Sequence, residues 1–373
     1  MGVPLIDLQW ENLPLREEFL KSFERILESG QFILNEEVTA FEADCARFFE
    51  LTDGFTCAVS SGTDALLLAL MVLELPRGGE VVVPTFTFFA TAGVVVRQGL
   101  IPRFADIEED TFNIDPASVV QQLNSNTLAV IPVHLYGQIA AMEPLRAICD
   151  KHRIALIEDA CQSMGARQGM APVGSWGDFA AISFFPTKNL GAFGDAGLLL
   201  SRHAHYREKT MRMRVHGMKN RYEHWEVGGN FRMDSLQAAI LRIKLRYLDK
   251  WQERRRENAR LYRELLGDLG IEEIVLPVER DGNYHVYNQY VIRVKGNKRD
   301  ILREYLTQRG IATMVYYPRP LHLQPCFAHL GYRRGDFPVA EQAAEEVLAL
   351  PIHPALGEKE ISEVVSAIRD FFG

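Results

Sequence analysis

The chain has 373 residues, and its hydrophobic share of 47% and charged share of 24% are those of an ordinary globular protein. Its longest apolar stretch falls well short of the roughly 18 residues that a membrane span needs, which argues against a membrane protein. A net charge of −8 argues against nucleic-acid binding through a basic surface. Five scattered cysteines without a C-x-x-C pair suggest neither disulfides nor a metal site, and they favour the cytoplasm.

Short apolar runs alternate with helical patterns through the first 200 residues. A helical pattern near 15–28 comes first, and β-branched runs follow at 80–85, 129–134, 154–159, 180–185 and 197–200. This alternation predicts an α/β domain with a buried, largely parallel sheet. Ligand-binding groups are expected at the carboxyl ends of these strands, where Thr85, Asp159 and Ser183 stand.

The pattern changes after about residue 250. A helix predicted over 234–247 leaves the sheet domain, and a strand at 289–294, a helix at 299–309, a Pro-rich loop at 316–325 and a helix near 358–371 follow. We therefore predict a large α/β domain over 1–250 and a smaller α+β domain over 251–373. The first 30 residues could pack on the smaller one.

Lys188 follows the strand at 180–185 and a turn built on Pro186. A partly buried lysine on a rigid element loses its proton readily, as a Schiff-base nucleophile requires. The alternative is an ordinary surface lysine in a glycine-rich loop. Lys188 alone does not decide between the two.

Asp159 ends an apolar strand, where an unpaired carboxylate would be costly. The pyridinium nitrogen of pyridoxal phosphate is a suitable cationic partner, because its protonated form makes the ring an electron sink. Gln162 could then bond the phenolic edge of the ring. The alternative for Asp159 is a helix cap at the strand end.

Residues 60–63, Ser-Ser-Gly-Thr, precede an apolar helix. Free backbone N–H groups at a helix N-terminus bind phosphate, and Ser183 could be a further donor. A plain Ser/Thr helix cap is the alternative, and caps are commoner than phosphate sites.

Together these segments resemble the DegT/StrS-type sugar aminotransferases, a family of fold-type-I pyridoxal-phosphate enzymes. The resemblance covers nearly the whole chain, in order, through GQFIL, SSGTDAL, PTFTFFAT, IEDACQSMGA, SFFPTKNLGAFGDAG, NFRMDSLQAAIL and YYPRPLHLQPCF. It implies a mostly parallel sheet flanked by helices, followed by a smaller α+β domain. It also implies ping-pong transamination, in which glutamate gives 2-oxoglutarate and leaves pyridoxamine phosphate, and a nucleotide-linked keto-sugar takes the amine.

The resemblance also assigns roles to single residues. Lys188 would bond the cofactor and shuttle a proton, Asp159 would pair with the pyridinium, and Gln162 would neighbour the cofactor hydroxyl. The remaining cofactor contacts would come from the phosphate-holding Gly62, Thr63 and Ser183 and from the ring-stacking Phe88, whose alternative is core packing. Asn230 would reach the phosphate of a partner subunit, which implies a homodimer with shared active sites.

Substrate contacts are expected from the basic stretch 207–221 and its surroundings and from the C-terminal loop. His216 and Arg232 would lie near the substrate mouth, and Tyr316, Tyr317 and His322 would contact the sugar. The alternatives are a solvated helix face and a packed loop. Phe185 stands where many relatives carry tyrosine, so one contact with a substrate hydroxyl is expected to be missing. Asn35 replaces a common glycine.

The expected substrate is a UDP- or dTDP-linked keto-sugar aminated at C3, for polysaccharide or secondary-metabolite synthesis. One alternative is a regulatory paralogue that binds the cofactor or a sugar nucleotide without turnover. A sugar dehydratase of the same fold is a further alternative, but those members replace the lysine with histidine, and this chain keeps Lys188.

Overall fold

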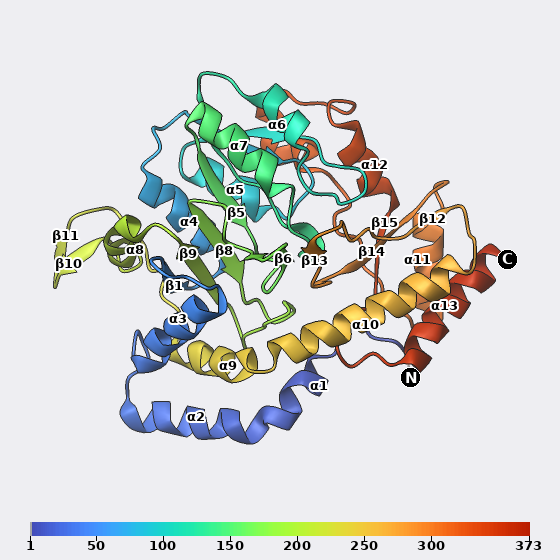
Figure 1. Cartoon of the computed structure of the whole chain (residues 1–373), viewed down its shortest axis with the longest axis horizontal. Helices are drawn as coiled ribbons and strands as arrows, with labels where there is room; N and C mark the ends of the chain where they lie inside the picture. Colours follow the sequence, from blue (N-terminus) through green and yellow to red (C-terminus); the bar gives the residue numbers. More distant parts are fainter. Residues whose placement is uncertain (1) are drawn as a thin grey trace.

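The computed structural model describes residues 2–373 and contains a central sheet of seven strands (Figure 1). The strand order is β1-β9-β8-β5-β4-β2-β3. Five neighbouring strands, from β8 to β3, run parallel, while β9 runs antiparallel to both β8 and β1. The strands are β1 (Phe55–Val59), β2 (Glu80–Pro84), β3 (Ile101–Ala105), β4 (Thr127–Val130), β5 (Ala155–Asp159), β8 (Phe179–Ser183) and β9 (Gly197–Ser201). The predicted mostly parallel α/β sheet is confirmed.

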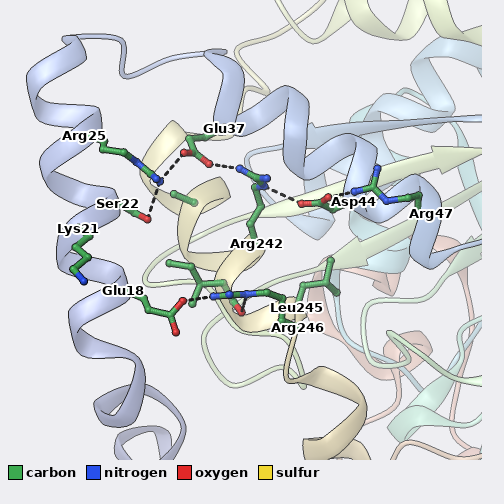
Figure 2. Close-up of a pocket in the computed structure, with 12 residues that line it drawn as sticks. Glu18, Lys21, Ser22, Arg25, Glu37, Asp44, Arg47, Arg242, Leu245 and Arg246 are labelled. Atoms are coloured by element: carbon green, nitrogen blue, oxygen red, sulfur yellow. Dashed lines mark hydrogen bonds and ion pairs between the residues drawn. The ribbon is translucent and has the colours of Figure 1, made fainter.

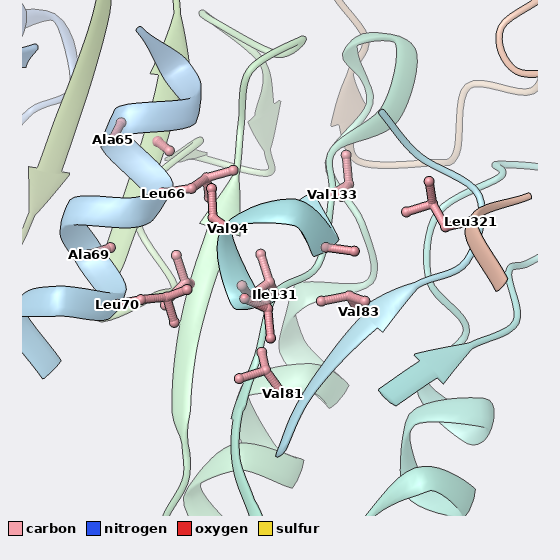
Figure 3. Close-up of a cluster of buried hydrophobic side chains, with 14 of the residues drawn as sticks. Ala65, Leu66, Ala69, Leu70, Val81, Val83, Val94, Ile131, Val133 and Leu321 are labelled. Carbon is pink, nitrogen blue, oxygen red and sulfur yellow. The ribbon is translucent and has the colours of Figure 1, made fainter. Parts of the chain in front are cut away.

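Each face of this sheet is covered by a hydrophobic core, because successive strand side chains point to opposite faces. Val81 and Val83 pack with α4 on one face, as Figure 3 shows, and Val82 belongs to the core of the other face. The covering helices are α3 (Glu36–Phe48), α4 (Gly62–Leu73), α5 (Ala90–Arg97), α6 (Pro116–Gln122), α7 (Met142–His152), α8 (Arg207–Met213) and α9 (Ser235–Leu245). Side chains buried on both faces explain the uninterrupted apolar runs in the sequence.

The predicted helix over 234–247 is divided in two. α9 ends at Leu245, and α10 (Leu248–Gly267) begins after Tyr247, whose N–H donates to the carbonyl of Lys244 at 2.9 Å. Such an i to i−3 bond tightens the last turn and ends the helix. Asn35, in place of the glycine, caps α3, because its Oδ1 accepts the Glu37 N–H at 3.0 Å.

A third core lies between the C-terminal half of α10, a small antiparallel sheet and helices α11 and α13. Its elements are β12 (Ile274–Val275), β14 (Tyr290–Val294), β15 (Val347–Leu350), α11 (Arg299–Gln308) and α13 (Glu358–Phe372). Leu321 and Phe337, from the segment before β15, instead enter the core beneath α4 and α5. The division at residue 250 stays a prediction, since residues after 250 contribute both to this core and to the core beneath α4 and α5.

The N-terminal segment contacts both parts of the molecule. Val3 pairs with Ile311 beside the small sheet, whereas α2 (Arg16–Ser29) lies along α9 (Figure 1). Figure 2 shows ion pairs among α2, α3 and α9. Arg25 of α2 pairs with Glu37 of α3 at 3.1 Å, and Arg242 of α9 pairs with the same Glu37 at 2.6 Å. Exposed pairs contribute little individually, so the buried Ile26 is the firmer attachment.

The remaining elements are short. They are α1 (Leu8–Asn12), β6 (Arg167–Gln168), β7 (Ala171–Pro172), β10 (Met218–Asn220), β11 (Glu223–His224), β13 (Asn283–Tyr284) and α12 (Pro338–Glu346). Within residues 2–373, every helix is either too short or too polar to cross a lipid bilayer.

Gly197 sets the spacing between β9 and the N-terminus of α4. A Cβ atom there would lie 2.3 Å from the Ser61 carbonyl carbon and 2.6 Å from the Gly62 nitrogen. We predict that Gly197→Ala lowers the free energy of unfolding by about 1–3 kcal/mol, because backbone atoms would have to shift. Urea unfolding followed by circular dichroism measures this change.

Gly267→Ala is the matched control, because a Cβ atom at this helical position meets nothing within 4 Å. It should raise the free energy of unfolding by up to about 1 kcal/mol, since alanine loses less backbone freedom than glycine. Equal stability of the Gly197→Ala variant and the wild type would contradict the close contact.

Candidate active site

A cavity of about 590 Å³ opens at the carboxyl ends of the parallel strands. Asp159 comes from the end of β5 and Ser183 from the end of β8, and the first turn of α4 forms another wall. Besides these, its lining includes Thr87, Phe88, Cys161, Gln162, Phe185, Lys188, Asp195, Gln289, Tyr316 and Tyr317. The fold therefore brings together residues up to 256 positions apart in the chain.

Lys188 lies in the loop between the adjacent strands β8 and β9. The loop is closed at its base by the Phe184 N–H, which donates to Ala196 O at 2.9 Å, and the Lys188 N–H donates to Phe185 O at 2.8 Å. Burial lowers the pKa of the Lys188 amine below its ordinary value, while Cys161 and Asp159 act in the opposite direction. The amine thus has an increased neutral fraction and is available as a nucleophile or base.

Asp159 is only 5% exposed, and its carboxylate is held from two sides. Oδ2 accepts the Thr91 hydroxyl at 2.7 Å, and Oδ1 accepts the Cys161 N–H at 3.3 Å. Among residues 2–373 no basic side chain forms an ion pair with it, although the Lys188 amine of the same cavity interacts with it electrostatically at longer range. A buried carboxylate without a counter-ion that faces a cavity fits a cationic group of a ligand, such as a protonated ring nitrogen.

Gln162 joins the cavity wall to the C-terminal loop. Its Oε1 accepts the Tyr136 N–H at 2.7 Å, and its Nε2 donates to the Tyr317 hydroxyl at 3.1 Å. The Tyr136 hydroxyl in turn donates to the Tyr316 carbonyl. These bonds hold both tyrosines of the C-terminal loop against the cavity.

The N-terminus of α4 forms one corner of the cavity. The Ser61 hydroxyl accepts the Asp64 N–H at 3.0 Å, while the Gly62 and Thr63 N–H groups pair with no group in the described part of the chain. A Cβ atom on Gly62 would lie 2.8 Å from that of Ser183, so only glycine allows this approach. Two free N–H groups at the positive end of a helix beside a serine fit a phosphate.

The other residues predicted to bind the cofactor or the substrate divide into those in the cavity and those outside it. Phe88 lines the cavity with its ring centroid 6.3 Å from that of Tyr317, and Phe185 lies at the rim with an exposed side chain. His216, Asn230 and Arg232 do not line it. Asn230 and His216 are exposed, and Arg232 is partly buried beside Val59.

His322, expected to contact the sugar, lies outside the cavity and is 1% exposed. Its Nδ1 bonds the Thr85 hydroxyl at 2.6 Å and its Nε2 bonds Glu341 Oε1 at 3.1 Å. Burial lowers the pKa of His322, whereas Glu341 raises it. Both ring nitrogens are bonded to protein groups. His322 is therefore a buried core residue in this structure, and the predicted contact with the sugar is not formed from this position.

The comparisons with known proteins agree with this geometry. The model of the DegT/DnrJ/EryC1/StrS aminotransferase family matches residues 14–369. The chain belongs to this family. The crystal structure of S. venezuelae DesV in complex with a ketimine intermediate is 38% identical, with a TM-score of 0.95 over 99% of this chain and 98% of that one.

Two curated relatives cover almost the entire aminotransferase. A "pleiotropic regulatory protein" of Geobacillus stearothermophilus is 46% identical over 100% of this chain and 99% of its own. A UDP-N-acetyl-3-dehydro-alpha-D-glucosamine 3-aminotransferase of Acidithiobacillus ferrooxidans is 41% identical over 99% of this chain and 97% of its own. The resemblance read from the sequence, its fold and its pyridoxal-phosphate cofactor are thereby confirmed.

Several residues of the aminotransferase site escaped the sequence analysis. Thr91 contacts Asp159, and Thr87 lines the cavity, although the motif PTFTFFAT pointed only to Phe88. Their position in the segment that follows β2 was the available signal, because ligand-binding groups gather beyond the carboxyl ends of parallel strands. For Asp195 and Gln289 the sequence carries no comparable signal.

We predict that His322→Ala lowers the free energy of unfolding by about 2–4 kcal/mol, because Thr85 and Glu341 both lose a buried partner. The dissociation constant of pyridoxal phosphate should change less than about twofold, since His322 does not line the cavity. Urea unfolding and absorbance titration measure the two quantities. The exposed His329, changed to alanine, is the control, and a large loss of cofactor affinity in His322→Ala alone would contradict the assignment.

Proposed function

We propose that the protein is an aminotransferase that moves an amino group from glutamate to C3 of a UDP- or dTDP-linked keto-sugar in the cytoplasm. The observation that carries the proposal is the shared cavity of Lys188, the Asp159 carboxylate without a counter-ion, and the N-terminus of α4. The name of the Acidithiobacillus relative supports a UDP-linked sugar and the C3 position. Its identity of 41% over nearly the whole chain supports a similar substrate class.

The residues present fit pyridoxal phosphate, which supplies an electron sink for the carbanion formed in transamination when it is bound. The Gly62 and Thr63 N–H groups and the Ser183 hydroxyl would bind its phosphate. Asp159 would pair with its ring nitrogen, and Gln162 would stand near its hydroxyl. Phe88 would cover the ring from the open side of the cavity.

Lys188 would bind the cofactor covalently and then act as the base and acid of the reaction. Its lowered pKa increases the fraction of the neutral amine, which is the form that both tasks need. The closed base of its loop keeps the amine near Asp159 and Cys161, so a proton can be taken from and returned to one face of the substrate. Tyr316 and Tyr317 would orient the sugar from the opposite wall.

The active sites would be shared within a homodimer. Asn230 is exposed and lies outside the cavity of its own chain, which suits a residue that reaches a partner's phosphate. His216 and Arg232 lie on the same segment and would carry the cations that meet the nucleotide diphosphate. Leu20, Phe23 and Leu27 leave an apolar stripe of α2 exposed, as expected of a surface that a second copy covers.

A regulatory protein without turnover is the second candidate, favoured by the name of the Geobacillus relative. A sensor needs cofactor or sugar binding, but it does not need a base with a lowered pKa beside the carboxylate. Addition of glutamate to the cofactor-loaded protein separates the two functions. An enzyme changes its visible absorbance as pyridoxamine phosphate forms, and a sensor does not. Retention of Lys188 also disfavours the dehydratase.

We predict that Lys188→Ala lowers the rate of amination by at least about 10³-fold, because nucleophile and base are both lost. The visible absorbance of the covalently bound cofactor should disappear as well. A coupled 2-oxoglutarate assay with a panel of keto-sugar nucleotides measures the rate. Lys250→Ala, at an exposed position of α10, is the control. Normal amination by Lys188→Ala would refute the proposed role.

We predict that Asn230→Ala and Lys188→Ala, each inactive alone, recover activity when their subunits are mixed. Random exchange at equal amounts makes half of the dimers mixed, and each of these holds one site with both residues, so about a quarter of the wild-type activity should return. Steady-state rates after subunit exchange measure the recovery. If Asn230 serves the site of its own chain, no recovery follows.

A further inference from the structure

Three side chains form a buried hydrogen-bonded chain that ends at the carboxylate of Asp159. The Thr87 and Thr91 hydroxyl oxygens lie 3.1 Å apart, and Thr91 Oγ1 lies 2.7 Å from Asp159 Oδ2. Thr87 is 3% exposed and Thr91 is fully buried, so water does not compete for these bonds. Thr91 lies in the first turn of α5 and Thr87 lies four residues earlier, in the bend before that helix, and Asp159 comes 68 residues after Thr91.

The donors and acceptors of this hydrogen-bonded chain can be assigned in only one way. An ionised carboxylate only accepts hydrogen bonds, so Thr91 must donate its single proton to Asp159. The Thr91 oxygen then accepts from Thr87, whose own proton is thereby used. Thr87, which lines the cavity, therefore offers only lone pairs to a ligand.

A threonine near the start of a helix usually bonds a backbone carbonyl three or four residues earlier. Thr91 bonds Asp159 across to the end of β5 instead. The backbone of Asp159 is already fixed, because its N–H donates to Pro132 O at 2.9 Å and its carbonyl accepts the His134 N–H at 3.0 Å. Thr91 therefore adds a constraint on the side chain alone.

We propose that Thr91 is a positioning residue that, supported by Thr87, aims the free lone pairs of Asp159 at the cofactor ring nitrogen. A carboxylate has about four acceptor positions, and the Thr91 hydroxyl and the Cys161 N–H occupy one on each oxygen. Because Asp159 lines the cavity, the remaining positions are available to a ligand there. The inference rests on the proposed function, since it assumes that the ring nitrogen is the group that Asp159 meets.

The test compares two ligands that differ only at the ring nitrogen. Pyridoxamine phosphate and its deaza analogue, in which a C–H group replaces that nitrogen, both bind without a covalent link. The ratio of their dissociation constants, measured by fluorescence titration of the full-length protein, therefore isolates the contact between Asp159 and the nitrogen. A merely structural effect on the cavity would change both constants equally and leave the ratio unaltered.

We predict that Thr91→Val lowers the preference for pyridoxamine phosphate over the deaza analogue about tenfold, because valine keeps the shape of threonine without its donor. Thr91→Ser should retain the preference within about threefold. Thr87→Val should lower it by a smaller factor than Thr91→Val, since the direct bond to Asp159 remains.

Thr85→Val is the matched control, because Thr85 is equally buried in the same segment and its hydroxyl bonds His322. It should lower the melting temperature and leave the ligand preference unchanged. A wild-type preference in Thr91→Val would overturn the role of Thr91 and leave the proposed function intact. Failure of the wild type to bind pyridoxamine phosphate, or to distinguish it from the analogue, would overturn the assignment of Asp159 and this inference together.

Discussion

The buried carboxylate of Asp159 is the constraint on which the site depends. It stands at the end of a strand whose neighbours on both sides are also parallel strands, so its backbone cannot move toward water. Burying such a charge is unfavourable unless donors and a cation compensate for it. The protein supplies two donors, and in the proposed function the cation comes from the cofactor. The loop that carries Lys188 and the N-terminus of α4 line the same cavity as this carboxylate.

The two ends of the proposed cofactor site are linked through glycines that allow backbone to approach backbone. Gly62 brings the first turn of α4 against Ser183, and Gly197 brings β9 against the residue before that turn. The distance between the N-terminus of α4, where the phosphate is proposed to bind, and Asp159 is therefore fixed by packing in the sheet. This arrangement explains how a small cofactor can meet a helix N-terminus and a strand-end carboxylate at once.

The sequence predicted the sheet, and it picked out candidate cofactor residues that the structure brings together in one cavity, because both depend on local signals. Apolar runs marked the strands, and the ordered motifs marked Lys188, Asp159 and the turn before α4. It could not predict the reversed direction of β9, since a short apolar run carries no information on strand direction. His322 was misplaced for a related reason. A histidine in a Pro-rich loop looks the same in sequence whether its partners are ligands or the buried Thr85 and Glu341.

The reversed strand β9 has a consequence for the lysine. Because β8 and β9 are hydrogen-bonded neighbours, the loop that carries Lys188 starts and ends at one point of the sheet and is closed there by the Phe184 N–H. Its conformational entropy is therefore lost when the protein folds, and little remains to be lost when a ligand arrives. Pre-organisation of this kind lets the binding energy of the cofactor appear as affinity instead of being consumed in ordering the residue that holds it.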